Sequence, residues 1–175
     1  MSTTAPPLRR ASLLDRFDAL PWHVFLLALF TIRWPLVILG SIIAHRIFAP
    51  PAMGDPFLDM DPILFFLLAV LISPLIETLI ECTLPYVVMR KLLGERFSVV
   101  RPWAFMIVSA LIMVAVHPIA VAIIPAFITG FIYAYGYARF ARESALLAFI
   151  LITMLHSFSN LAGLTAYWLG FVPAI

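Results

Sequence analysis

The chain has 175 residues, of which 64% are hydrophobic and only 11% are charged, and its mean hydropathy is +1.09. Because a soluble domain carries about 25% charged residues, this composition excludes an ordinary soluble protein and predicts a single integral membrane domain. The formal net charge is +2, and the basic residues flank apolar stretches instead of forming a stripe, so we expect no nucleic-acid partner.

The first twenty residues differ in character from the rest of the chain. We expect residues 1–20 to be a polar cytoplasmic N-terminus and residues 21–175 to form one transmembrane helical domain. The arginines of this start precede a full-length apolar span without a small-residue cleavage site, so they do not predict a secretory signal peptide. Cys82 is the single cysteine, and it excludes a disulfide framework.

Five apolar segments follow, and they predict an all-α, polytopic transmembrane bundle with about five spans. A helix needs about 20 apolar residues to cross the bilayer core. The segments cover residues 21–44, 62–89, 103–121, 125–140 and 144–171. The fourth is short, so we expect it to form a hairpin with the third whose turn hardly leaves the membrane.

The basic residues predict how the bundle is oriented. Lys and Arg concentrate on the cytoplasmic side of membrane proteins. If the N-terminus is cytoplasmic, nine of the eleven basic residues fall inside, the outer loops hold only Arg46, and Arg33 lies within the first span. We therefore expect a cytoplasmic N-terminus and an outer C-terminus, in a bacterial inner (plasma) membrane. The nine are Arg9, Arg10, Arg16, Arg90, Lys91, Arg96, Arg101, Arg139 and Arg142.

Four polar side chains inside the apolar segments are the candidate site residues: Glu77, His117, His156 and Asn160. A polar or ionisable group at membrane depth is costly and is therefore a functional candidate. Counted from the nearest inner basic residue, Glu77 lies about 20 Å deep, His156 about 21 Å and His117 about 24 Å. Asn160 follows His156 by one helical turn and shares its face. These depths predict that the four groups converge.

This set of side chains suits hydrolysis without a covalent nucleophile. A carboxylate among apolar helices can act as general base for water, and a histidine can orient that water. A second histidine and an asparagine amide can donate hydrogen bonds to an oxyanion. We expect no cofactor. Zinc is the alternative because His and Glu are zinc ligands, although the His-Glu-x-x-His pattern is absent.

The order of these motifs resembles the CPBP family, the CAAX prenyl endopeptidase and bacteriocin-processing (Abi) family. The resemblance covers about residues 72–164 and rests on Pro74-Leu-Ile-Glu77-Thr78, on His117, on Phe127-Ile-Thr-Gly130-Phe-Ile-Tyr-Ala134 and on His156-Ser-Phe-Ser-Asn160. It implies an intramembrane glutamic protease in which Glu77 is the catalytic base, helped by His117. His156 and Asn160 would form the oxyanion hole.

The chain also departs from the pattern of that family. The first motif usually reads Glu-Glu-x-x-x-Arg, and here Thr78 and Cys82 replace its second Glu and its Arg. Met113 stands where the family usually has an aromatic residue. Two functions therefore stay open: an endopeptidase for membrane-anchored or lipidated peptides, and a catalytically silent CPBP-like protein. The silent protein would be an immunity factor or an accessory subunit that binds a partner membrane protein.

Two further expectations concern residues outside the candidate site. Arg33 and Glu81 have similar predicted depths, so we expect an ion pair between them, which is the usual way to tolerate such charges in a span. Five aromatic residues are expected to be interfacial or lipid-facing: Tyr133, Tyr135, Tyr137, Trp103 and Trp168.

Overall fold

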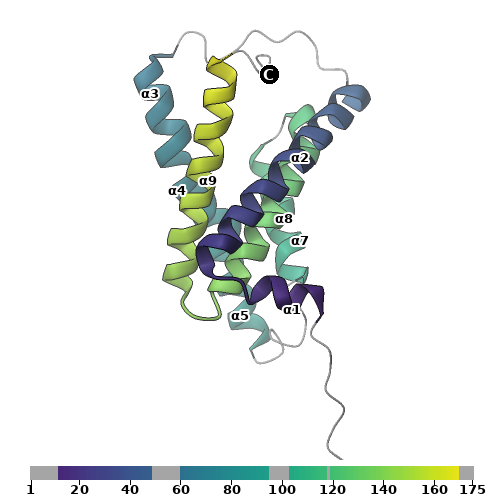
Figure 1. Ribbon diagram of the computed structural model, residues 1–175, viewed down its shortest axis with the longest axis vertical. Coiled ribbons are helices and arrows are strands. Elements are labelled where there is room, and N and C mark those ends of the chain that lie inside the picture. The colour runs from purple at the N-terminus through teal and green to yellow at the C-terminus, as the bar shows by residue number, and fades with distance from the viewer. Residues whose placement is uncertain (1–11, 49–59, 95–102, 118, 170–175) are drawn as a thin grey trace, which may run out of the picture.

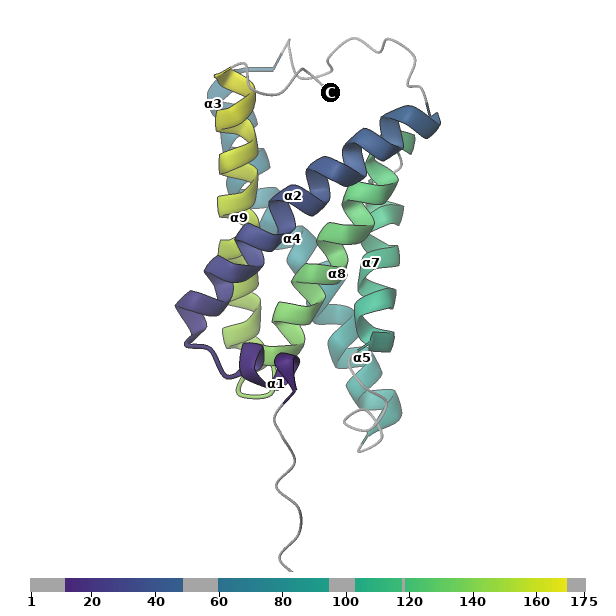
Figure 2. The ribbon, with the colours of Figure 1, turned by 45° about the vertical axis from the view of Figure 1, so that its right-hand side comes forward.

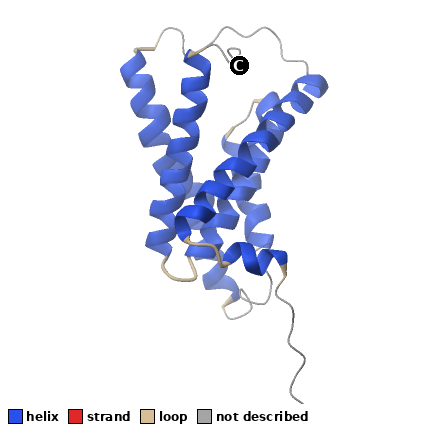
Figure 3. Ribbon diagram, in the orientation of Figure 1, coloured by secondary structure: helices blue, strands red, loops and turns tan. Residues whose placement is uncertain are grey.

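A computed structural model of the chain describes residues 12–48, 60–94, 103–117 and 119–169. All regular structure in these residues is helical (Figure 3). The elements, in chain order, are α1 (Leu13–Asp18), α2 (Trp22–Phe48), α3 (Pro62–Phe66), η1 (Leu67–Ile72), α4 (Ser73–Thr78), η2 (Leu79–Thr83), α5 (Leu84–Leu93), α7 (Trp103–Val116), η3 (Ala120–Ala122), α8 (Ile123–Phe140) and α9 (Ala145–Trp168).

The prediction of an all-α membrane bundle is confirmed. Four helical segments in the described part of the chain are long and apolar enough to cross a membrane: Trp22–Phe48, Pro62–Leu93, Ala120–Phe140 and Ala145–Ala166. The fifth apolar helix, Trp103–Val116, is shorter. The expected short span was therefore misplaced, because the third segment is the short one. A residue that precedes proline disfavours helical geometry, and α7 accordingly ends at Val116, before His117 and Pro118.

The helix over Pro62–Leu93 contains two π-helical segments, η1 and η2, on either side of α4. Each π segment is followed closely by a proline. The N–H of Ser73 bonds to the carbonyl of Leu68, five residues back, just before Pro74. The N–H of Leu84 likewise bonds to Leu79, just before Pro85. Proline lacks an N–H and clashes with the carbonyl one turn earlier, so a wider turn lets the helix continue past it.

Helix α8 is the centre of the bundle and packs against α2, α7 and α9. Close approach of α7 depends on Gly130, where an added Cβ would lie 2.7 Å from the Cβ of Met113 and 2.9 Å from the Cα of Ala110. Tyr133 and Tyr137 of α8 are 1% and 0% exposed. The expectation that these two tyrosines are interfacial or lipid-facing is therefore wrong, because α8 is surrounded by other helices.

The helices form two groups that diverge toward one end of the molecule. Figures 1 and 2 show α3 beside α9 on one side and α7 beside α8 on the other, with α2 crossing obliquely. The groups meet away from that end, where α8 packs on α9 and η2 packs on α7 and α8, while α9 also packs along η1 and α4 of its own group. Short α1 lies at the other end and is held there by Asp18, which accepts a 2.6 Å hydrogen bond from the Tyr135 hydroxyl. Phe17, Asp18 and Leu20 of the predicted polar N-terminus thus pack on the bundle, whereas residues 12–16 are exposed.

Candidate active site

The candidate site is centred on Glu77, which the helix between the two π segments projects into the bundle. One carboxylate oxygen of Glu77 lies 3.3 Å from Nε2 of His156 on α9. The other accepts a short hydrogen bond from the hydroxyl of Ser73, one turn earlier on the same helix. The side chain of His156 is 4% exposed and that of Glu77 is 18% exposed, so both groups are largely removed from the surface.

Tyr133 of α8 forms one wall of this site. Its ring centroid lies 4.7 Å from that of His156, and the two rings are tilted by 47°. The Tyr133 hydroxyl faces Ser159. Neither this hydroxyl nor Nδ1 of His156 makes a hydrogen bond with the described residues, although both are buried. An unpaired polar atom in a buried position is costly, so the Tyr133 hydroxyl and Nδ1 of His156 are available to form hydrogen bonds with a ligand or with water.

The side chain of Asn160, which was expected to converge with the other three groups, bonds to the backbone of the neighbouring helix. Its side-chain amide donates a 2.8 Å hydrogen bond to the backbone carbonyl of Ala69 in η1. That carbonyl needs a donor, because Ser73 bonds to Leu68 instead and Pro74 has no N–H. One N–H of the Asn160 amide is therefore committed to joining α9 to the second membrane helix.

His117 is connected to the site less directly than His156 is. It follows the last turn of α7, where its Nδ1 lies 2.9 Å from the carbonyl of Met113. It is near enough to His156 for their charges to interact. The described contacts include no hydrogen bond or ion pair between His117 and Glu77. The structure thus joins Glu77 and His156 directly and places Asn160 one turn along α9.

Sequence reasoning missed two residues of this site, Ser73 and Tyr133. The spacing of Ser73, four residues before Glu77, was a usable signal, because such residues face each other on a helix. The role of Tyr133 had no such local signal. Its contact with His156 depends on how α8 packs against α9, which is a property of the tertiary structure.

The expected ion pair between Arg33 and Glu81 does not form. The Arg33 guanidinium lies 5.5 Å from the centroid of the Tyr133 ring, and no carboxylate among the described residues is within ion-pair distance of it. Glu81 is 1% exposed, and its Oε1 makes no hydrogen bond with the described residues. The two side chains come from different helices, and similar depth along a helix does not determine the direction in which each side chain points.

No group of three His, Cys, Asp or Glu side chains in the described ranges could hold a metal ion. Glu77 and His156 are the two potential ligands in contact, and His117 makes no direct contact with either. The zinc alternative would therefore require His117 to move toward the pair. Chemistry without a cofactor stays a prediction.

No family model matches the chain, no curated protein matches its sequence, and no solved structure matches its fold. The resemblance to the CPBP family therefore stays a prediction that rests on the short motifs alone.

Proposed function

We propose that this integral membrane protein is an intramembrane endopeptidase that hydrolyses peptide bonds with water activated by Glu77 and His156. The observation that carries the proposal is the 3.3 Å contact between these two side chains. It brings a carboxylate and an imidazole from two separate helices to one buried point, beside the unpaired hydroxyl of Tyr133. Such a pairing is a recurrent arrangement for general acid–base chemistry.

The reaction would proceed in two steps. In the first, Glu77 takes a proton from a water molecule while the water oxygen bonds to the peptide carbonyl carbon. His156, in contact with the same carboxylate, would orient that water, and His117 is the candidate N–H donor for the negative charge that develops on the carbonyl oxygen. In the second step the C–N bond breaks, and the proton held by Glu77 passes to the leaving amine. The contact with Ser73 would hold the Glu77 carboxylate in a fixed orientation.

The substrates would be membrane-anchored or lipidated peptides, because the site lies among helices that are long and apolar enough to cross a membrane. The last turns of α5 and α8 carry basic residues at one end of the bundle. Arg46 lies in the last turn of α2, at the other end of the bundle. This asymmetry favours a cytoplasmic location for the N-terminal end. A bacterial inner membrane is the proposed location.

The test is a peptidase assay on the full chain in lipid vesicles, with a library of membrane-anchored fluorogenic peptides. We expect wild type to cleave at least one of them and Glu77→Gln to abolish cleavage, because an amide cannot accept the proton. The matched control is Glu143→Gln, which changes an exposed carboxylate on the turn before α9 and should leave the rate unchanged. Chelators should have no effect. Activity that is lost to chelation and restored by zinc would support the zinc alternative.

A catalytically silent protein is the second candidate, and one observation favours it. Both carboxylate oxygens of Glu77 and one N–H of Asn160 already have protein partners, as they would in a purely structural polar network. In this case the chain would be an immunity factor or an accessory subunit of a larger membrane complex. Wild type would then cleave none of the peptides, and Glu77→Gln would lower thermal stability without changing any activity.

A further inference from the structure

We propose that Arg33 binds the anionic head of a membrane amphiphile whose apolar chain lies in the groove between α2 and α9. This inference goes beyond the proposed hydrolysis and does not require Glu77 to be a catalytic base. It joins two observations: a long apolar groove, and a group of buried hydrogen-bond donors that begins one helical turn along α2 from Phe30, the last α2 residue that lines the groove.

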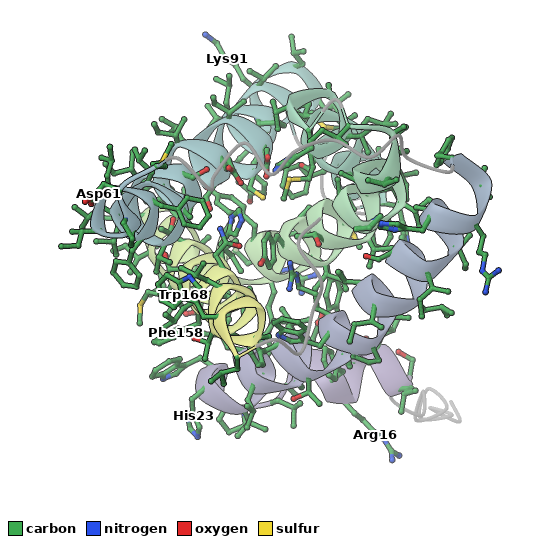
Figure 4. The ribbon with its side chains drawn as sticks, turned by 90° about the horizontal axis from the view of Figure 1, so that it is seen from above. Arg16, His23, Asp61, Lys91, Phe158 and Trp168 are labelled. Atoms are coloured by element: carbon green, nitrogen blue, oxygen red, sulfur yellow. The ribbon has the colours of Figure 1, made fainter. Side chains whose placement is uncertain are left out.

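The groove has a volume of about 720 Å³ and is lined by the first half of α2 and the second half of α9. Its walls are almost entirely aliphatic and aromatic. Figure 4 shows Phe158 of α9 and His23 of α2 on the same side of the bundle, where the groove lies. An apolar hollow of this kind on the lipid-facing side of a membrane protein suits a hydrocarbon chain. Its lining includes Trp22, Leu26, Phe30, Phe158 and Ala162.

The groove leads toward Arg33. Trp22, Leu26 and Phe30 repeat every four residues along one face of α2, and the next positions on that face are Arg33 and Trp34. The rings of Phe30 and Trp34 are in edge contact, with centroids 6.2 Å apart. Trp34 also faces α9, because a Cβ added at Gly163 would lie 3.8 Å from its ring. Arg33 and Trp34 therefore continue the face of α2 that lines the groove, one turn beyond Phe30.

Three buried donors lie around this point, and the third of them, the Tyr133 hydroxyl, faces Ser159. Nε of Arg33, Nε1 of Trp34 and the hydroxyl of Tyr133 are all buried and make no hydrogen bond with the described residues. Tyr133 is 1% exposed and lies beneath the Arg33 guanidinium, 5.5 Å from it. An arginine within a membrane helix normally pairs with an acid or with backbone carbonyls. Here the Tyr133 ring is the nearest partner among the described residues, and this cation–π contact leaves Nε of Arg33 without an acceptor.

The chemistry of these donors defines the ligand class. A guanidinium presents a planar fork of N–H groups that matches the oxygens of a carboxylate or of a phosphate. An apolar chain that begins beside this fork would continue into the groove past Phe30. The ligand is therefore an amphiphile with one anionic oxygen group and one hydrocarbon chain. A fatty acid and an alkyl phosphate share this chemistry.

The proposal is tested by measuring the binding of radiolabelled dodecanoate to the full chain in nonionic detergent micelles. We expect saturable binding that unlabelled dodecanoate displaces and that dodecanol, which has the same chain without a charge, displaces with about tenfold lower affinity or worse. A competition arm with dodecyl phosphate identifies which anionic head Arg33 prefers. Equal displacement by dodecanol would overturn the proposal.

Matched variants assign the binding to this site. Arg33→Met should abolish the preference for the anionic head, whereas Arg46→Met, which changes an exposed arginine at the far end of α2, should leave it intact. Ala162→Trp should block the groove and weaken binding even where Arg33 is kept. Glu77→Gln should bind as wild type does, so a failure of the proposed hydrolysis would not affect this result. Unchanged binding in Arg33→Met and Ala162→Trp, or no binding in wild type, would overturn the proposal. Arg33 would then contact only other residues of the protein.

Discussion

The side-chain amide of Asn160 on α9 donates a 2.8 Å hydrogen bond to the backbone carbonyl of Ala69 in η1. The carbonyl is free to accept it because the N–H of Ser73 bonds one residue farther back and Pro74 has no N–H. A proline in one membrane helix thus creates an unmet acceptor, and an asparagine in another helix supplies the donor. In a bilayer, where water cannot replace such a bond, this contact also joins the two helices that carry Glu77 and His156.

Asn160→Ala should destabilise the protein by about 1–3 kcal/mol, because it leaves the Ala69 carbonyl buried without a donor. Thermal unfolding in detergent micelles measures the effect. The control is Thr165→Ala, which removes an exposed hydroxyl that bonds only within its own helix, to Leu161. The CPBP resemblance predicts instead that Asn160→Ala reduces turnover by about 10²-fold while the fold stays intact. A variant as stable as wild type would contradict the structural role.

Pro74→Ala should make the bond from Asn160 less important. It restores an N–H at position 74, so the helix itself can supply a donor to the Ala69 carbonyl. In this background we expect Asn160→Ala to cost less stability than it does in wild type. A double-mutant cycle on the free energy of unfolding measures the difference. Strictly additive costs for the two substitutions would show that Pro74 and Asn160 act independently.

Gly130→Ala should destabilise the contact between α7 and α8. The added methyl group would lie 2.9 Å from the Cα of Ala110, and backbone cannot move aside as a flexible side chain can. Gly163→Ala is the matched control, because its methyl group meets only ordinary contact with Trp34 at 3.8 Å. Alanine favours helices over glycine by about 1 kcal/mol, so Gly163→Ala should be neutral or stabilising. Melting temperatures that shift equally in both variants would argue against close packing at Gly130.

Arg33→Leu and Glu81→Leu should have additive effects on stability, because the structure places no ion pair between these side chains. Additivity within about 0.5 kcal/mol is the usual result for groups that share no contact. The free energies of unfolding of the two single variants and of the double variant provide the cycle. Partial recovery of stability in the double variant would indicate that Arg33 and Glu81 form the ion pair that their similar depths suggested.

The local features of the site were predictable to different degrees. Glu77 and His156 were correctly expected to lie together, because two polar groups at matched depth in apolar helices find each other when water is excluded. The partner of Asn160 was not predictable. The wide turn at η1 decides which carbonyl is exposed, and this depends on how the helix adapts to Pro74 while it packs against α9. The same limit explains the missed contact between Tyr133 and His156.

Composition and hydropathy by themselves determined that this protein is a helical membrane bundle, because a chain so poor in charge must satisfy its backbone hydrogen bonds within helices. They also placed each polar residue at a depth along its own helix, since the rise per residue is constant. Only the tertiary structure decided the direction of each side chain. Rotation and tilt depend on neighbouring helices. These place Arg33 over the Tyr133 ring and bring His156 onto the Glu77 carboxylate, while His117 bonds to the carbonyl of Met113.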